Sequence, residues 1–211
     1  MGFDPDYIFF MDDFLDIKAD LTNEWTEVKD ASAATVDMEA DTQHGRLLMQ
    51  SQATTDDSGT SIQGNEIYLP TLSKRIWFET KLQSSDADQQ ELFIGFSVNF
   101  TSNPEALLTA ANRIGFQVDD GNASILCITE ASGVENSANS DVDLVDATDV
   151  ILGMQIIGLS VVEFYVDRVL VQTLTTDVPA TEMALAAYQL SGDASGTKSV
   201  SIDYIMTIVQ R

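Results

Sequence analysis

The chain has 211 residues, 44% of them hydrophobic, and a mean hydropathy near zero, which suits one folded domain with a sizeable core. It carries 34 acidic against 10 basic residues, a formal net charge of -24. Such a field repels nucleic acids and anionic membrane surfaces, whose binding depends on Lys and Arg, so we expect neither partner.

Apolar side chains at every second position recur along the chain and predict β-strands. In 75–83, for example, Ile76, Phe78, Thr80 and Leu82 fall on one face. We expect about a dozen short strands, including those at 46–51, 67–69, 75–83, 92–98, 114–118, 124–129, 150–157, 161–166, 169–175, 183–190 and 200–208.

The last of these strands shows the clearest alternation. Its expected inward row contains Val200, Ile202, Tyr204, Met206 and Ile208. The same alternation places Asp203 on the opposite face with Ser201, Ile205 and Thr207.

Three connections have their own signals. Pro104 to Ala111 predicts a short helix that Asn103 can cap. Asp167-Arg168 joins two β-branched runs and predicts a tight hairpin. The polar stretch 132–149 predicts a long loop, which either binds an ion or a partner or is simply solvated.

Many short strands with few helical crossovers favour an all-β fold, an antiparallel two-sheet β-sandwich with one short helix. We expect residues 1–14 to form an N-terminal arm and first strand, and residues 15–211 to form a single domain. The apolar run 7–11 lacks the basic flank of a secretory signal.

Residues that usually carry chemistry are scarce. His44 is the only histidine and lies in a polar turn, which argues against a histidine-based mechanism or a zinc cluster. Cys127 is the only cysteine and lies in an apolar run, where we expect an inert buried thiol. The chain has neither a Gly-rich phosphate loop nor a G-x-S-x-G elbow.

Carboxylates are plentiful, and Glu79, Glu91 and Glu163 lie on or next to strands. However, sugar-cleaving sandwiches generally place two acidic residues on one face of one strand, and no predicted strand has that spacing. Calcium prefers oxygen ligands, and its candidate ligands here are Asp12, Asp13, Asp119, Asp120 and Asp203. Solvated turn carboxylates are the alternative interpretation, so we expect no cofactor, with calcium kept open.

Several phrases, taken in order, resemble the concanavalin A-like (laminin G-type) jelly roll as it occurs in tailed-phage structural proteins. They span nearly the whole chain and are FMDDF at 10–14, GRLLM at 45–49, IWFETKL at 76–82, FIGFS at 93–97, IGFQV at 114–118, VEFYVD at 162–167 and VSIDYI at 200–205.

The resemblance implies two curved antiparallel sheets whose first and last strands lie side by side. It also implies a capsid decoration (cement) protein of a bacteriophage: a virion structural protein, not an enzyme, made in the host cytoplasm and bound to the major capsid protein on the outer capsid surface. We expect a homo-oligomer, specifically a homotrimer. The N-terminal apolar side chains would pack against the domain's own edge or a neighbouring subunit; these interface residues are Phe3, Tyr7, Ile8, Phe9 and Phe10.

Two alternatives come from other functional classes. A carbohydrate-binding module or phage adhesin would bind a glycan on one sheet face, with Trp77 or Tyr165 as a stacking platform. A glycoside hydrolase or lyase would depend on Glu79 or Glu163.

Overall fold

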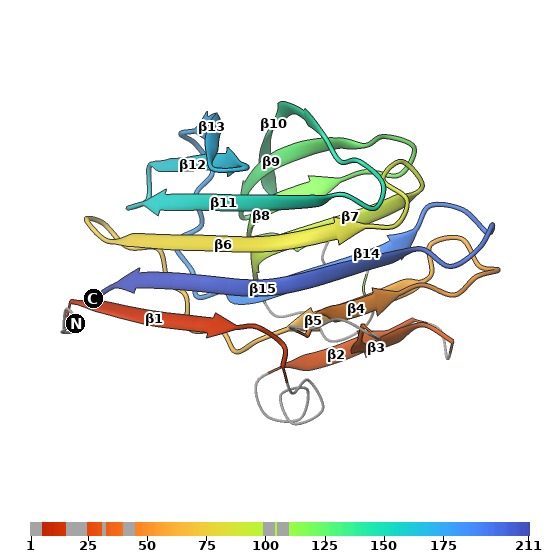
Figure 1. The fold of residues 1–211 in the computed structure, drawn as a ribbon. Coiled ribbons are helices and arrows are strands. Elements are labelled where there is room, and N and C mark those ends of the chain that lie inside the picture. The colour runs from red at the N-terminus through yellow and green to blue at the C-terminus, as the bar shows by residue number, and fades with distance from the viewer. Residues whose placement is uncertain (1–5, 16–24, 31–32, 40–44, 99–103, 105–109) are drawn as a thin grey trace.

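Alternating burial along the strands builds two antiparallel sheets packed face to face. The computed structural model describes residues 6–15, 25–30, 33–39, 45–98, 104 and 110–211. Figure 1 shows the two layers, and the first and last described residues, Asp6 and Arg211, lie side by side at one end of the molecule. The expected all-β sandwich is confirmed.

The first sheet has eight strands in the order β13-β12-β11-β6-β15-β4-β3, with β1 also paired to β15. Its strands are β1 (Tyr7–Asp12), β3 (Thr35–Met38), β4 (Leu47–Gln50), β6 (Arg75–Ser84), β11 (Asp149–Ile157), β12 (Val161–Val166), β13 (Val169–Leu174) and β15 (Ser199–Gln210). Because β1 pairs antiparallel with β15, the first and last strands lie side by side, as the resemblance implies.

The second sheet has seven strands in the order β10-β9-β8-β7-β14-β5-β2. They are β2 (Thr26–Lys29), β5 (Gly59–Gln63), β7 (Gln90–Ser97), β8 (Arg113–Val118), β9 (Ser124–Ala131), β10 (Val134–Asp143) and β14 (Ala184–Ser191). The expected strand at 183–190 therefore exists, displaced by one residue.

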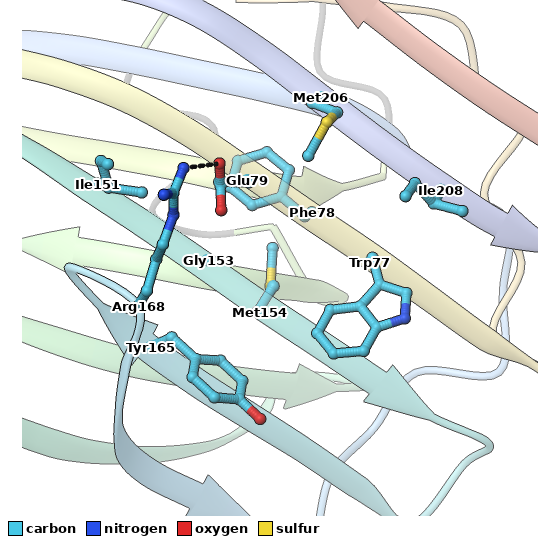
Figure 2. A pocket seen from close by; sticks show the side chains of 10 residues that line it. All are labelled: Trp77, Phe78, Glu79, Ile151, Gly153, Met154, Tyr165, Arg168, Met206 and Ile208. Atoms are coloured by element: carbon cyan, nitrogen blue, oxygen red, sulfur yellow. Dashed lines mark hydrogen bonds and ion pairs between the residues drawn. The ribbon is translucent and has the colours of Figure 1, made fainter.

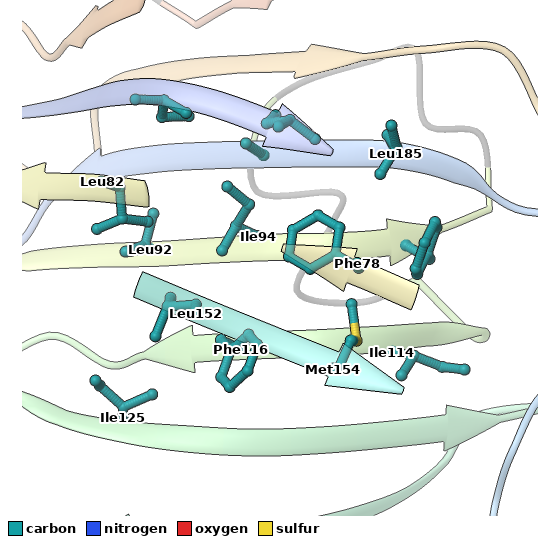
Figure 3. Close-up of a cluster of buried hydrophobic side chains, with 14 of the residues drawn as sticks. Phe78, Leu82, Leu92, Ile94, Ile114, Phe116, Ile125, Leu152, Met154 and Leu185 are labelled. Carbon is teal, nitrogen blue, oxygen red and sulfur yellow. The ribbon is translucent and has the colours of Figure 1, made fainter. Parts of the chain in front are cut away.

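The main core lies between the sheets, where the inward rows of both meet (Figure 3). Phe78 of β6 packs edge-on against Phe96 of β7, and Phe116 of β8 packs edge-on against Phe164 of β12. Burying a large apolar side chain contributes about 1.5–3 kcal/mol, so these rows fix which face of each strand turns outward. Cys127 is fully buried in this core, and burial raises the pKa of its thiol to about 12.

The expected inward row of β15 is correct for its first half and wrong for its second. Val200 and Ile202 are buried, but a β-bulge between Ile202 and Tyr204 adds one residue to β15 opposite β6. The extra residue reverses the alternation, so Ile205 and Thr207 turn inward and are almost completely buried. The expected inward members that turn outward instead are Tyr204, Met206 and Ile208.

The structure differs from expectation in two places and leaves a third untested. The predicted loop at 132–149 is wrong for its first half, which forms β10 and pairs with β9. Residues 67–69 provide only a single bridge, from Tyr68 to Met183. The predicted helix at 104–111 lies almost entirely outside the described residues.

The hairpin at Asp167-Arg168 is confirmed, since positive φ angles of 49° and 66° suit a tight turn between β12 and β13. No helix of the described segments is long and apolar enough to span a bilayer.

The backbones of β7 and β8 lie unusually close together at Gly95 of β7. A Cβ atom at Gly95 would lie 2.3 Å from the carbonyl oxygen of Ile114 on β8. We expect Gly95→Ala to lower the free energy of unfolding by about 1–3 kcal/mol, because the strands must separate to admit the methyl group. The matched control is Gly153→Ala on β11, where the nearest atom would be 3.6 Å away. Equal unfolding midpoints in urea for the two variants would contradict this explanation.

Candidate functional site

A hollow of about 350 Å³ lies on the outer face of the eight-stranded sheet, the face turned away from the other sheet. Figure 2 shows its side chains, which come mainly from β6, β11, β12 and β15. They are Trp77, Phe78, Glu79, Ile151, Gly153, Met154, Tyr165, Arg168, Met206 and Ile208.

The register explains why the sheet is hollow here. Tyr165, Gly153, Glu79 and Met206 are successive partners across β12, β11, β6 and β15. Gly153 has no side chain, so the outer face is open between Tyr165 and Glu79. Phe78 and Met154, which belong to the inward rows, line the bottom of this opening.

Two aromatic side chains border the hollow. Trp77 and Tyr165 have ring centroids 6.5 Å apart and ring planes inclined at 35°. The indole of Trp77 is 38% exposed, although a large apolar group of this kind is usually buried. Exposed aromatic faces beside a recess are suited to stacking against a flat, partly apolar ligand.

Glu79 supplies the carboxylate of the hollow. The hydroxyl of Tyr204 donates to Glu79 Oε1 at 2.7 Å, and Arg168 Nη2 lies 3.4 Å from the same oxygen. Burial, followed by the bond to the Glu79 carboxylate, raises the pKa of Tyr204 to about 12. The tyrosine is therefore a neutral donor at physiological pH, and Arg168 offsets the charge of Glu79.

A second group of polar side chains lies on β11 and β12, two residues along from the pair Gly153 and Tyr165. Tyr165 donates to Glu163 Oε2 at 2.8 Å, and burial and this carboxylate raise the pKa of Tyr165. With its amide turned to satisfy both neighbours, Gln155 donates to Glu163 at 3.1 Å and accepts from Arg75 at 2.9 Å. These groups form a polar margin beside Trp77, whose register partners are Gln155 and Ile208.

The structure brings together the residues that we expected for glycan binding, Trp77 or Tyr165, and those expected for a glycoside hydrolase or lyase, Glu79 or Glu163. Trp77, Glu79 and Tyr165 all line the hollow, with Glu163 on its margin. Glu91 lies apart from them, on β7 of the other sheet.

The calcium candidates lie at separate places. Asp12 accepts from the Trp25 indole at 2.7 Å, and Asp203 accepts from Lys81 at 2.9 Å. Asp13 follows β1, whereas Asp119 and Asp120 follow β8. In the described part of the chain no three His, Cys, Asp or Glu side chains are grouped to hold a metal ion. Calcium binding therefore stays a prediction without a defined site.

The N-terminal interface residues lie on β1, except Phe3, which is outside the described residues. Tyr7, Ile8 and Phe9 are exposed, whereas Phe10 turns inward and packs edge-on against Trp25.

Sequence reasoning missed half of the hollow. A lone Gly in a strand pattern, such as Gly153, indicates a bulge or a close approach, and this signal was available. Tyr204, Met206 and Ile208 were assigned to the wrong face because the alternation itself gives no sign of the bulge at Asp203. Arg168 was also missed, because its bond to Glu79 joins residues 89 positions apart in the sequence.

No family model and no curated protein matches the chain. Solved structures resemble it closely in shape. A glycoside hydrolase family 16 endo-glucanase from Bacteroides ovatus has 12% identity over 93% of this chain and 98% of its own, with a TM-score of 0.64. The β-glucanase of Bacillus licheniformis has 13% identity over 96% and 98%, with a TM-score of 0.64. The carbohydrate recognition domain of Emp46p has 11% identity over 93% and 94%, with a TM-score of 0.63.

At these identities the likeness shows the fold, which is the concanavalin A-like jelly roll, as the sequence resemblance indicated. Nothing in the comparisons points to a phage capsid decoration protein. Our expectation that the protein is not an enzyme is contradicted, because glucanases share its fold over nearly its whole length.

Because the pKa of Tyr204 is raised in the folded chain, the stability of the fold should depend on pH in the alkaline range. The folded chain retains this phenolic proton up to about pH 12, whereas the unfolded chain releases it near pH 10.0. Unfolding therefore releases a proton in this window, and stability falls as pH rises through it. We expect the fall in unfolding midpoint to be smaller in Tyr204→Phe. Tyr68→Phe and Tyr165→Phe controls account for the two other tyrosines whose pKa is raised. An identical decline in wild type and Tyr204→Phe would contradict this assignment.

Proposed function

We propose that the protein binds a neutral glycan in the hollow on the outer face of the eight-stranded sheet. The observation that carries the proposal is the placement of Trp77 and Tyr165 beside a recess floored by Gly153, Phe78 and Met154. A sugar ring has two apolar faces and a rim of hydroxyls. The aromatic faces would stack on the ring, and the polar margin would bind its hydroxyls.

The hydrogen-bonding groups suit hydroxyls better than ions. Glu79 and Glu163 accept, Arg168 donates, and the tyrosine hydroxyls both donate and accept. Each of these groups already has a partner, so the site is ordered before the ligand arrives, which reduces the entropy lost on binding.

Charge selects a neutral glycan over an acidic one. The net charge of -24 repels a polyanion. Arg168 is the basic residue that lines the hollow, and it bonds to Glu79. Its charge is thus offset by a carboxylate of the hollow itself, which weakens its attraction for a uronate or sulfate chain.

Titration calorimetry with neutral oligosaccharides tests the proposal. Mixed-linkage glucan fragments are the first probes, because one solved structure of the same fold is a mixed-linkage glucan GH16 protein from Bacteroides ovatus in complex with a product. We expect Trp77→Ala to weaken binding at least about tenfold, or ~1.4 kcal/mol, through lost stacking. Gly153→Leu should also weaken it, since the new side chain fills the recess and its Cβ would lie 3.6 Å from the nearest backbone atom, an ordinary van der Waals contact.

Leu72→Ala is the matched control, because this side chain is 75% exposed and does not line the hollow. It should bind as wild type does. Absence of binding to every neutral glycan on an array, or tighter binding of polyuronate than of neutral fragments, would overturn the proposal.

The capsid decoration role, which the sequence resemblance implies, has weaker support than glycan binding. It rests on the resemblance of sequence phrases, whereas glycan binding rests on a defined hollow and on carbohydrate-active fold neighbours. We therefore make glycan binding, which the sequence offered as an alternative, the main proposal.

Hydrolysis of the bound glycan is the second candidate function, favoured by the position of Glu79 in the hollow and by the glucanase neighbours. Glu79 and Glu163 are two strands and two residues apart, so their backbones are about 12 Å apart. Cooperating carboxyl groups lie roughly 5–10 Å apart, so the two side chains would lean toward each other over the substrate.

Release of reducing ends from neutral glucans measures this activity. We expect Glu79→Gln to lower the rate at least about a hundredfold, because the amide cannot act as acid, base or nucleophile. Glu91→Gln, on the other sheet, is the control and should retain the full rate. Product formation that survives Glu79→Gln unchanged would remove Glu79 from the mechanism.

A further inference from the structure

The N-terminal strand β1 forms an open edge of the eight-stranded sheet. Within the described residues β1 pairs only with β15, and Figure 1 shows it as the outermost strand at the end where Asp6 and Arg211 meet. An open edge presents unpaired backbone groups, and soluble proteins usually protect such edges with charges, proline or a covering segment.

The register identifies the backbone groups that face this open side. Arg211 N donates to Asp6 O at 2.7 Å, which makes that pair a hydrogen-bonded one. Hydrogen-bonded and non-hydrogen-bonded pairs alternate in an antiparallel ladder. Ile8, Phe10 and Asp12 therefore bond toward β15, while the N–H and C=O groups of the residues between them point away from β15. Those residues are Tyr7, Phe9 and Met11.

Two of the usual protective features, charged residues and proline, are absent from the outward-facing stretch of this edge. The segment Tyr7-Ile-Phe-Phe-Met11 contains no charged residue and no proline. The side chains of Tyr7, Phe9 and Met11 are 44%, 52% and 48% exposed. They share one face, because alternate residues of a strand point the same way. Open hydrogen-bonding groups and exposed apolar side chains thus belong to the same residues.

We propose that a second copy of this chain pairs antiparallel with β1 about a two-fold axis at Phe9. The row is self-complementary, because such pairing sets Phe9 opposite its own copy and Tyr7 opposite Met11 of the copy. Aromatic–aromatic and sulfur–aromatic neighbours are favourable cross-strand pairs. The pairing joins the two eight-stranded sheets into one and extends their outer faces side by side.

The charge of the chain sets how this dimer responds to salt. Two copies that each carry -24 repel each other, while the paired strands attract through backbone bonds and apolar contacts. Salt screens the repulsion and leaves the attraction in place. The dimer therefore tightens as ionic strength rises, whereas an interface held by opposite charges would weaken.

Sedimentation analysis of the full chain over a range of concentration and salt tests the proposal. We expect a monomer–dimer equilibrium that shifts toward the dimer at high salt. Phe9→Glu sets like charges opposite each other at the axis and should weaken the dimer at least about tenfold. Val134→Glu is the matched control: it changes the charge equally at a side chain that is 58% exposed, but it lies on β10 of the other sheet. It should leave the dimer nearly unchanged.

Phe9→Pro provides a second variant that does not depend on charge. It removes an outward N–H without breaking a bond to β15, so the monomer should keep its thermal midpoint while the dimer is lost. A wild-type chain that stays monomeric at every concentration and salt would overturn the proposal. So would equal weakening by Val134→Glu and Phe9→Glu, or a dimer that Phe9→Pro leaves intact.

Discussion

One extra residue in β15 decides what the outer face of the eight-stranded sheet can do. The bulge at Asp203 lets Val200 and Ile202 fill one end of the core while Ile205 and Thr207 fill the other. Without it, strict alternation would bury Tyr204, Met206 and Ile208 and expose Ile205. Two neighbouring residues of β6 hold the bulge in place. Thr80 donates to the carbonyl of Tyr204 at 2.8 Å, and Lys81 donates to the Asp203 carboxylate.

The hollow follows from this register together with one missing side chain. Tyr204 reaches Glu79 only because it faces outward, and the bond fixes the carboxylate at the side of the recess. Gly153 supplies the space, and the aromatic side chains of Trp77 and Tyr165 supply its apolar border. The site is thus a product of strand register and not of a specialised loop.

The sequence predicts whatever depends on local periodicity. The inward row of β6 and the turn at Asp167-Arg168 were predicted because burial and turn chemistry act within a few residues. β10 was missed, because its polar, Asn- and Ser-rich sequence has a weak strand signal and its partner β9 provides the ladder. The outward turn of Tyr204 was also missed, since a bulge arises from the match between two strands and leaves no period in either one.

The same fold serves both binding and cleavage of glycans, so the difference must lie in how carboxylates are distributed on the sheet. In this chain Glu79 and Glu163 lie on different strands, and each is already bonded to a tyrosine hydroxyl. A carboxylate bonded in this way holds its position but is less available to attack a substrate or transfer a proton. Catalysis would require the ligand to displace at least one of these tyrosines, whereas binding uses the arrangement as it stands. This difference is why glycan binding takes precedence over hydrolysis for a site built of these residues.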